Sequence, residues 1–77
     1  MKLNEKHTIL IDDEDKEHDI AWLMRNKLGL LGELEKEEIQ ENKDKIQLRL
    51  DNVQILLDEV RLLGYEVKDN FDIVEVI

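Results

Sequence analysis

The chain has 77 residues, a formal net charge of −9 and no cysteine. This length supports a single domain and the composition excludes a disulfide framework. The excess of acidic residues repels phosphate backbones and anionic lipid surfaces, so we expect neither direct nucleic-acid binding nor a membrane role.

The hydrophobic content, 42% of the residues, is too high for a disordered acidic tail, so the chain is predicted to fold. No apolar run approaches the roughly 20 residues that span a bilayer. Because a chain without cysteine is typical of a reducing compartment, we expect a cytoplasmic location.

The first predicted element is a strand over residues 7–11, HTILI, which is short, apolar and β-branched. A dense acidic surface follows it, formed by Asp12, Asp13, Glu14, Asp15, Glu17 and Asp19. Aspartates at a helix start accept hydrogen bonds from free backbone N–H groups, and carboxylates favour the positive end of the helix dipole. We therefore interpret the acidic run as the solvated first turn of a helix that begins at about residue 14.

A metal site is the competing interpretation of the acidic run. A calcium loop places a glycine at its tight turn, and this run contains none. His18 with Asp15 or Glu14 supplies two ligands, whereas a structural zinc ion takes four. We expect no metal and no other cofactor.

The first helix is predicted over residues 14–40. Its apolar residues recur at steps typical of one helical face, at Ile20, Leu23, Met24, Leu28, Leu31 and Leu34. Gly29 and Gly32 lie within it, where they would let another backbone approach closely.

The second helix, over residues 44–63, has the clearest pattern in the chain. Its apolar residues step by four, three, four and three and form one continuous seam: Ile46, Leu50, Val53, Leu57 and Val60. Gly64 follows two leucines and suits a left-handed cap that ends the helix.

Two arrangements of the helices remain open. In the first, which we favour, the chain turns near residues 42–44 and the helices form an antiparallel hairpin. In the second, the chain breaks at Gly29 or Gly32 and one long helix runs over residues 33–63.

The C-terminal segment alternates as strands do, over residues 65–68 and 71–76, with a two-residue turn at Asp69 and Asn70. The predicted fold is therefore a single α+β domain over residues 1–77 that is mostly helical. Two long helices form a helical hairpin, and the N-terminal strand and the C-terminal hairpin form one small β-sheet.

Four apolar residues remain outside the predicted core: Trp22 on the first helix and Leu48, Ile55 and Leu62 on the second. The last three repeat every seven residues and fall far round the helix from the seam. Either a sheet covers this second stripe, or the stripe is an interface with an identical chain or with another protein.

The sequence offers little for catalysis. Thr8 is the only serine-type hydroxyl, and with His7 and His18 it does not assemble a nucleophile, a base and an orienting group. We expect no enzyme, but an acidic protein-interaction module. We expect it to form a homodimer through the second helix, as in a coiled coil, and to bind another protein.

The alternative function is an inhibitor that imitates nucleic acid and docks on a basic protein. Such a mimic requires the acids of residues 12–19 and 33–44 to lie on a common face.

Overall fold

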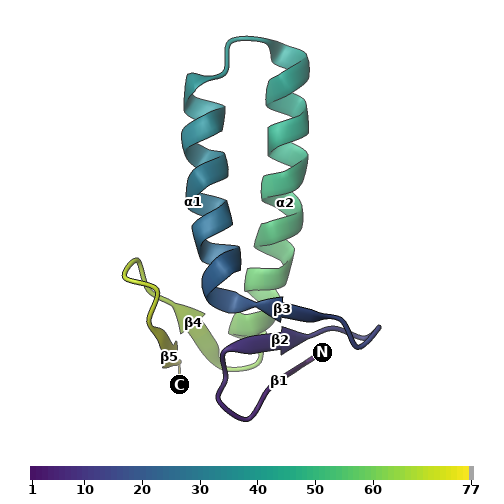
Figure 1. Ribbon diagram of the computed structural model, residues 1–77, viewed down its shortest axis with the longest axis vertical. Helices are drawn as coiled ribbons and strands as arrows, with labels where there is room; N and C mark the ends of the chain where they lie inside the picture. The colour runs from purple at the N-terminus through teal and green to yellow at the C-terminus, as the bar shows by residue number, and fades with distance from the viewer. Residues whose placement is uncertain (77) are drawn as a thin grey trace.

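The computed structural model describes residues 1–76 and has the predicted α+β architecture (Figure 1). Two antiparallel helices stand side by side as a hairpin, and every strand lies at the open end of that hairpin. The opposite end is the short connection between the helices. The molecule is therefore elongated, and its longest extent is 42 Å.

The N-terminal segment forms an antiparallel sheet of three short strands: β1 (Lys2–Leu3), β2 (Ile9–Ile11) and β3 (Glu17–Asp19). The predicted first strand starts at Ile9 and not at His7. The reason lies in the β1–β2 loop, where the side-chain Oδ1 of Asn4 accepts hydrogen bonds from the N–H groups of Thr8 and Ile9 at 2.7 and 2.9 Å. These bonds keep His7 and Thr8 in the loop.

The predicted helix start at residue 14 is wrong, because α1 (Ile20–Lys36) begins six residues later. Residues 12–19 form the β2–β3 hairpin instead, with Glu17 opposite Ile11 and Asp19 opposite Ile9. A hairpin loop and a helix start both leave backbone N–H groups without partners, and aspartate oxygens suit either. Only Asp19 caps the helix, by accepting a hydrogen bond from the Trp22 N–H at 3.3 Å.

The helical hairpin is confirmed, but its turn lies earlier than predicted. A connection of three residues, Glu37 to Ile39, joins α1 to α2 (Gln40–Leu62), so the chain does not turn near residues 42–44. The Glu37 carboxylate accepts hydrogen bonds from the N–H groups of Glu38 and Ile39, both at 3.1 Å. The bond from Ile39 is the main reason that the pKa of Glu37 lies below its ordinary value. Helix α1 continues through both glycines, which excludes a break there.

The helices pack through the predicted seam of α2. Ile46, Leu50 and Val53 are buried against Leu23 and Leu30 of α1. Leu30 falls almost in line with Leu23 because it lies seven residues later. Two residues of the predicted face of α1, Leu28 and Leu31, are 43% and 44% exposed, whereas Leu30, which was not predicted, is buried. The rest of that face is buried or packed against a buried cluster: Ile20, Leu23, Met24 and Leu34.

Helix α2 ends as predicted at a left-handed glycine. Gly64 has φ 97°, and its N–H donates to the Arg61 carbonyl at 2.9 Å. The chain continues into β4 (Tyr65–Val67) and β5 (Ile73–Glu75), which pair antiparallel. The predicted two-residue turn is wrong, since Asp69, Asn70 and Phe71 form a three-residue loop closed by a 2.8 Å bond from the Lys68 N–H to the Asp72 carbonyl.

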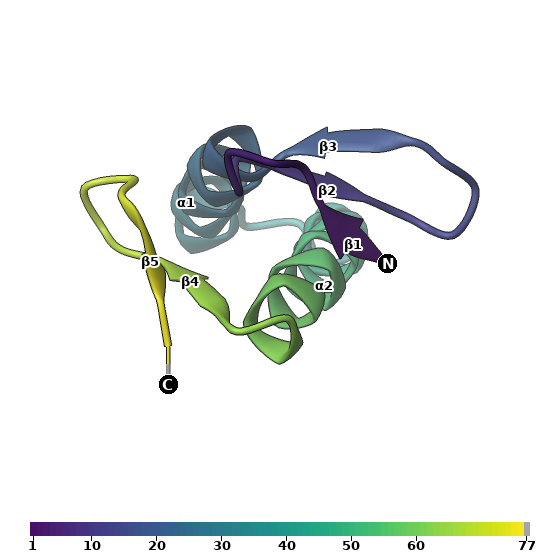
Figure 2. The ribbon, with the colours of Figure 1, turned by 90° about the horizontal axis from the view of Figure 1, so that it is seen from below.

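The strands form two separate sheets, whereas one sheet was predicted. Seen from below the helices, the β1–β3 sheet and the β4–β5 hairpin flank the helix ends on different sides (Figure 2). Both sheets pack on one buried cluster of Leu10, Ile20 and Val60. The strands of the two sheets meet on helix side chains of this cluster and do not pair with each other, although the His7 ring of the β1–β2 loop stacks on Tyr65 of β4 at 4.5 Å.

Candidate interaction surface

The outer face of α2 carries an uncovered row of large apolar side chains. Leu48, Ile55 and Leu62 are 62%, 56% and 80% exposed. Seven residues make almost two full turns of an α-helix, so the three side chains lie in one line, on the side of α2 opposite the buried seam. Neither sheet covers this line, which we call the apolar row.

A seven-residue repeat in the sequence accompanies the apolar row. Residues 47–53 read QLRLDNV and residues 54–60 read QILLDEV, and residues 40–46, QENKDKI, share the first and fifth positions. Only the apolar part of this repeat was predicted from the sequence. The signal for the rest is glutamine at every first position and aspartate at every fifth position.

Each glutamine of the repeat holds the aspartate four residues later. The Gln40, Gln47 and Gln54 side-chain amides donate to Oδ1 of Asp44, Asp51 and Asp58 at 2.9, 2.9 and 2.8 Å. Such pairs each stabilise a helix by roughly 0.2–0.5 kcal/mol. The three aspartates, which we call the aspartate row, also lie four residues before the three members of the apolar row and border it on one side.

The other border of the apolar row is mixed in charge. Lys45, Asn52 and Glu59 lie along it, and the Lys45 ammonium group lies 3.8 Å from the carboxylate of Glu41, which continues the line of the apolar row seven residues before Leu48. Within residues 1–76, no carboxylate of the aspartate row forms an ion pair. The surroundings of the apolar row are therefore predominantly negative.

Trp22, the fourth predicted interface residue, lies on the other helix. It is 58% exposed in the first turn of α1 and does not belong to the apolar row. Further along α1, a Cβ atom built on Gly29 or Gly32 would meet nothing within 4 Å, so no backbone of this chain approaches them closely. The structure thus gives these glycines no packing role within the chain.

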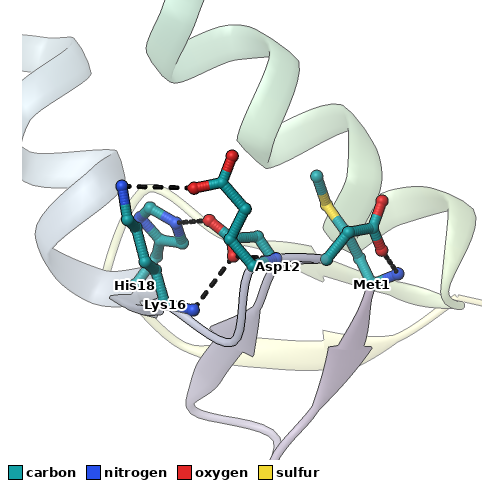
Figure 3. A network of polar contacts seen from close by, with 6 residues as sticks. Met1, Asp12, Lys16 and His18 are labelled. Carbon is teal, nitrogen blue, oxygen red and sulfur yellow. Dashed lines mark hydrogen bonds and ion pairs between the residues drawn. The ribbon is translucent and has the colours of Figure 1, made fainter.

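The predicted acidic surface is a tightly bonded β-hairpin loop (Figure 3). Asp12 accepts hydrogen bonds from the N–H groups of Glu14 and Lys16 at Oδ1, both at 2.9 Å, and its Oδ2 lies 2.9 Å from the His18 Nε2. The carboxylate of Asp13 lies 2.8 Å from the Met1 amino group.

The remaining acids of the hairpin have local roles as well. Glu14 lies 3.3 Å from the Lys16 ammonium group, Asp19 caps α1, and Asp15 takes a left-handed conformation with φ 63°. Glu17 lies on β3 opposite Ile11. Most of these carboxylates thus have partners within the hairpin or at the start of α1.

The pKa values of this region follow from those contacts. The pKa of Asp12 lies below its ordinary value, chiefly because of the His18 hydrogen bond and then because of the Lys16 N–H. The pKa of the Met1 amino group is raised by its hydrogen bond and charge interaction with Asp13.

The two acidic segments that a nucleic-acid mimic would need lie far apart. The acids of residues 12–19 are in the hairpin at the sheet end, whereas residues 33–44 surround the connection at the opposite end of the helices (Figure 1). The structure therefore does not bring the two segments together.

Comparison of the chain with protein-family models, with curated proteins and with solved structures gives no match. No helix described in residues 1–76 is long and apolar enough to cross a membrane. In the same part of the chain, no three His, Cys, Asp or Glu side chains gather closely enough to hold a metal ion.

Proposed function

We propose that this chain is a non-enzymatic protein-interaction module that forms a homodimer through the outer face of α2. One observation carries the proposal: Leu48, Ile55 and Leu62 are 56–80% exposed and lie in one line on the side of α2 away from the core. Contiguous exposed apolar surface of this kind marks interaction sites. Removing these side chains from water on association stabilises the complex by the hydrophobic effect.

The apolar row suits a symmetric pair of chains. In a two-fold dimer the same surface faces itself on both subunits. Leu48 and Leu62 each lie seven residues from Ile55, so the row matches a second copy in either relative direction. Ile55 then meets Ile55 of the partner subunit at the centre of the contact.

Charge sets how this dimer responds to salt. Each chain has a formal net charge of −9, and the borders of the apolar row are negative. Self-association therefore brings like charges together, and screening reduces their repulsion. We expect the homodimer to become stronger as the salt concentration rises.

The experiment is to measure the absolute mass in solution, by sedimentation equilibrium, for wild type and for Ile55→Asp. An unpaired carboxylate in the centre of the contact is costly to bury, so the variant should raise the dimer dissociation constant by about tenfold or more. The matched control is Ile39→Asp, because Ile39 is 60% exposed at the far end of the molecule. Equal association of the two variants would contradict the proposal.

The proposal includes two further features predicted from the sequence. We keep the binding of another protein as part of the function, and we keep the cytoplasmic location, which rests on the cysteine-free composition. We do not carry the nucleic-acid mimic forward, because its two acidic segments occupy opposite ends of the molecule.

A further inference from the structure

The aspartate row has a regular geometry that self-association leaves unused. Asp44, Asp51 and Asp58 recur every seven residues, which corresponds to about 10.5 Å along a helix. Each one lies beside a member of the apolar row, because residues four apart are neighbours on a helix surface. On the outer face of α2, the apolar and the anionic side chains therefore form two adjacent rows with the same seven-residue spacing.

The carboxylates of this row are also oriented. The glutamine amide of each pair bonds only to Oδ1, and Oδ2 of each aspartate has no hydrogen-bond partner within residues 1–76. All three side chains are exposed. One acceptor oxygen of each carboxylate thus stays available to a donor from outside the chain.

Basic residues of this helix form no ion pair with the aspartate row within residues 1–76. Arg49 falls about 120° round the helix from the apolar row, whereas Arg61 lies three residues after Asp58 and about 60° from the aspartate row. Lys45 borders the row on the other side and lies within 3.8 Å of Glu41. A ligand that supplies cations on its own surface would meet complementary charge here.

We propose that the protein bound by this face is a basic amphipathic helix, with an apolar line bordered by arginine or lysine. This inference rests on the proposed function, since it uses the same face of α2. Arginine suits the aspartate row because its guanidinium group donates several hydrogen bonds to carboxylate oxygens. Such a ligand replaces the like-charge contact of the homodimer with an attractive one, so its binding weakens as salt rises.

The probe is a fluorescently labelled synthetic helix of three heptads, with leucine at every seventh position and arginine at the positions that border the leucines. The control peptide has glutamate in place of each arginine. Binding to the full chain is followed by fluorescence anisotropy at low and at high salt. We expect the basic peptide to bind and to weaken with salt, and the acidic peptide not to bind.

Two variants of equal net charge separate a specific contact from general attraction. The first combines Asp44→Asn, Asp51→Asn and Asp58→Asn, and it should weaken peptide binding by about tenfold at low salt. The second combines Glu33→Gln, Glu35→Gln and Glu38→Gln at the far end of the hairpin, where all three glutamates are exposed. It should bind the peptide nearly as wild type does.

Equal losses in the two triple variants, or equal binding of the two peptides, would overturn the inference. Failure of the basic peptide to bind would also overturn it. The homodimer would not be affected by that result, because it is tested independently with Ile55→Asp. Conversely, a chain that binds the peptide through the aspartate row but stays monomeric would remove the homodimer and retain the inference.

Discussion

The β2–β3 hairpin and the outer face of α2 are both rich in acidic residues, but they use them differently. In the hairpin, the Asp12 carboxylate is occupied on both oxygens by groups of the same chain. On α2, each carboxylate of the aspartate row receives one bond from a glutamine and retains a free oxygen beside an exposed apolar side chain. The partners of a carboxylate, rather than the local density of acids, distinguish the structural loop from the surface that we propose for binding.

The sharpest test of this comparison pairs Asp12→Ala with Asp51→Ala. Asp12→Ala removes the acceptor of two backbone N–H groups and the partner of His18, so we expect the melting temperature to fall by roughly 5–10 °C. Asp51→Ala removes one exposed side-chain pair and should change it by less than about 3 °C. Thermal unfolding followed by circular dichroism measures both.

Dimer formation should depend little on the hairpin. Asp12→Ala should change the dimer dissociation constant much less than Ile55→Asp does, at a temperature where the chain is folded, because Asp12 bonds within the hairpin and is not a member of the apolar row. A large stability loss in Asp51→Ala, or none in Asp12→Ala, would break the comparison.

The second largest expected effect is a loss of folding stability at low pH, caused by protonation of Asp12. The pKa of Asp12 is lowered by its contacts with His18 and Lys16, so the folded state binds its proton less readily than the unfolded state. Its contribution to stability is therefore complete above the ordinary Asp pKa of about 4 and is lost as the pH falls through the lower, folded value. Urea unfolding from about pH 6 to about pH 3 should show this loss.

The lowered pKa values of Glu37 and Glu66 act in the same direction. In Asp12→Ala, the free energy of unfolding should therefore still fall at low pH, but by less than in wild type, because the contribution of the hairpin is absent. An identical pH profile for wild type and Asp12→Ala would contradict the structural role of this carboxylate.

The smallest effect is expected at Asp15, the hairpin acid whose backbone is in the left-handed region, with φ 63°. Glycine adopts this conformation without steric cost but loses more chain entropy on folding. We expect Asp15→Gly to raise the free energy of unfolding by about 0.5 kcal/mol. Asp15→Ala, which keeps the steric cost, should lower it, and the opposite order in urea unfolding would refute this explanation.

The parts of the fold that depend on local periodicity were predictable from the sequence. The buried seam of α2 follows from apolar steps of three and four residues, and the helix end follows from the left-handed Gly64. The start of α1 was not predictable, because Asp12 forms the same kind of bond to backbone N–H groups in a loop as a helix cap would form.

Long-range pairing and the candidate surface were harder to predict. Whether β2 and β5 share a sheet depends on the packing around Val60, which lies distant from both in the sequence. The apolar row was predicted from its spacing, whereas the aspartate row was missed. These three aspartates are among 20 acidic residues, so their regular spacing is recognised only together with the glutamines four residues earlier.

The most direct measurement is disulfide cross-linking of Ile55→Cys. The chain contains no other cysteine, and in the proposed homodimer Ile55 faces Ile55 of the partner subunit in either direction of pairing. Mild oxidation at low protein concentration should therefore give covalent dimer rapidly from Ile55→Cys and far more slowly from Ile39→Cys. Equal rates for the two variants, or no covalent dimer from Ile55→Cys, would contradict the assignment of the outer face of α2 as the contact surface.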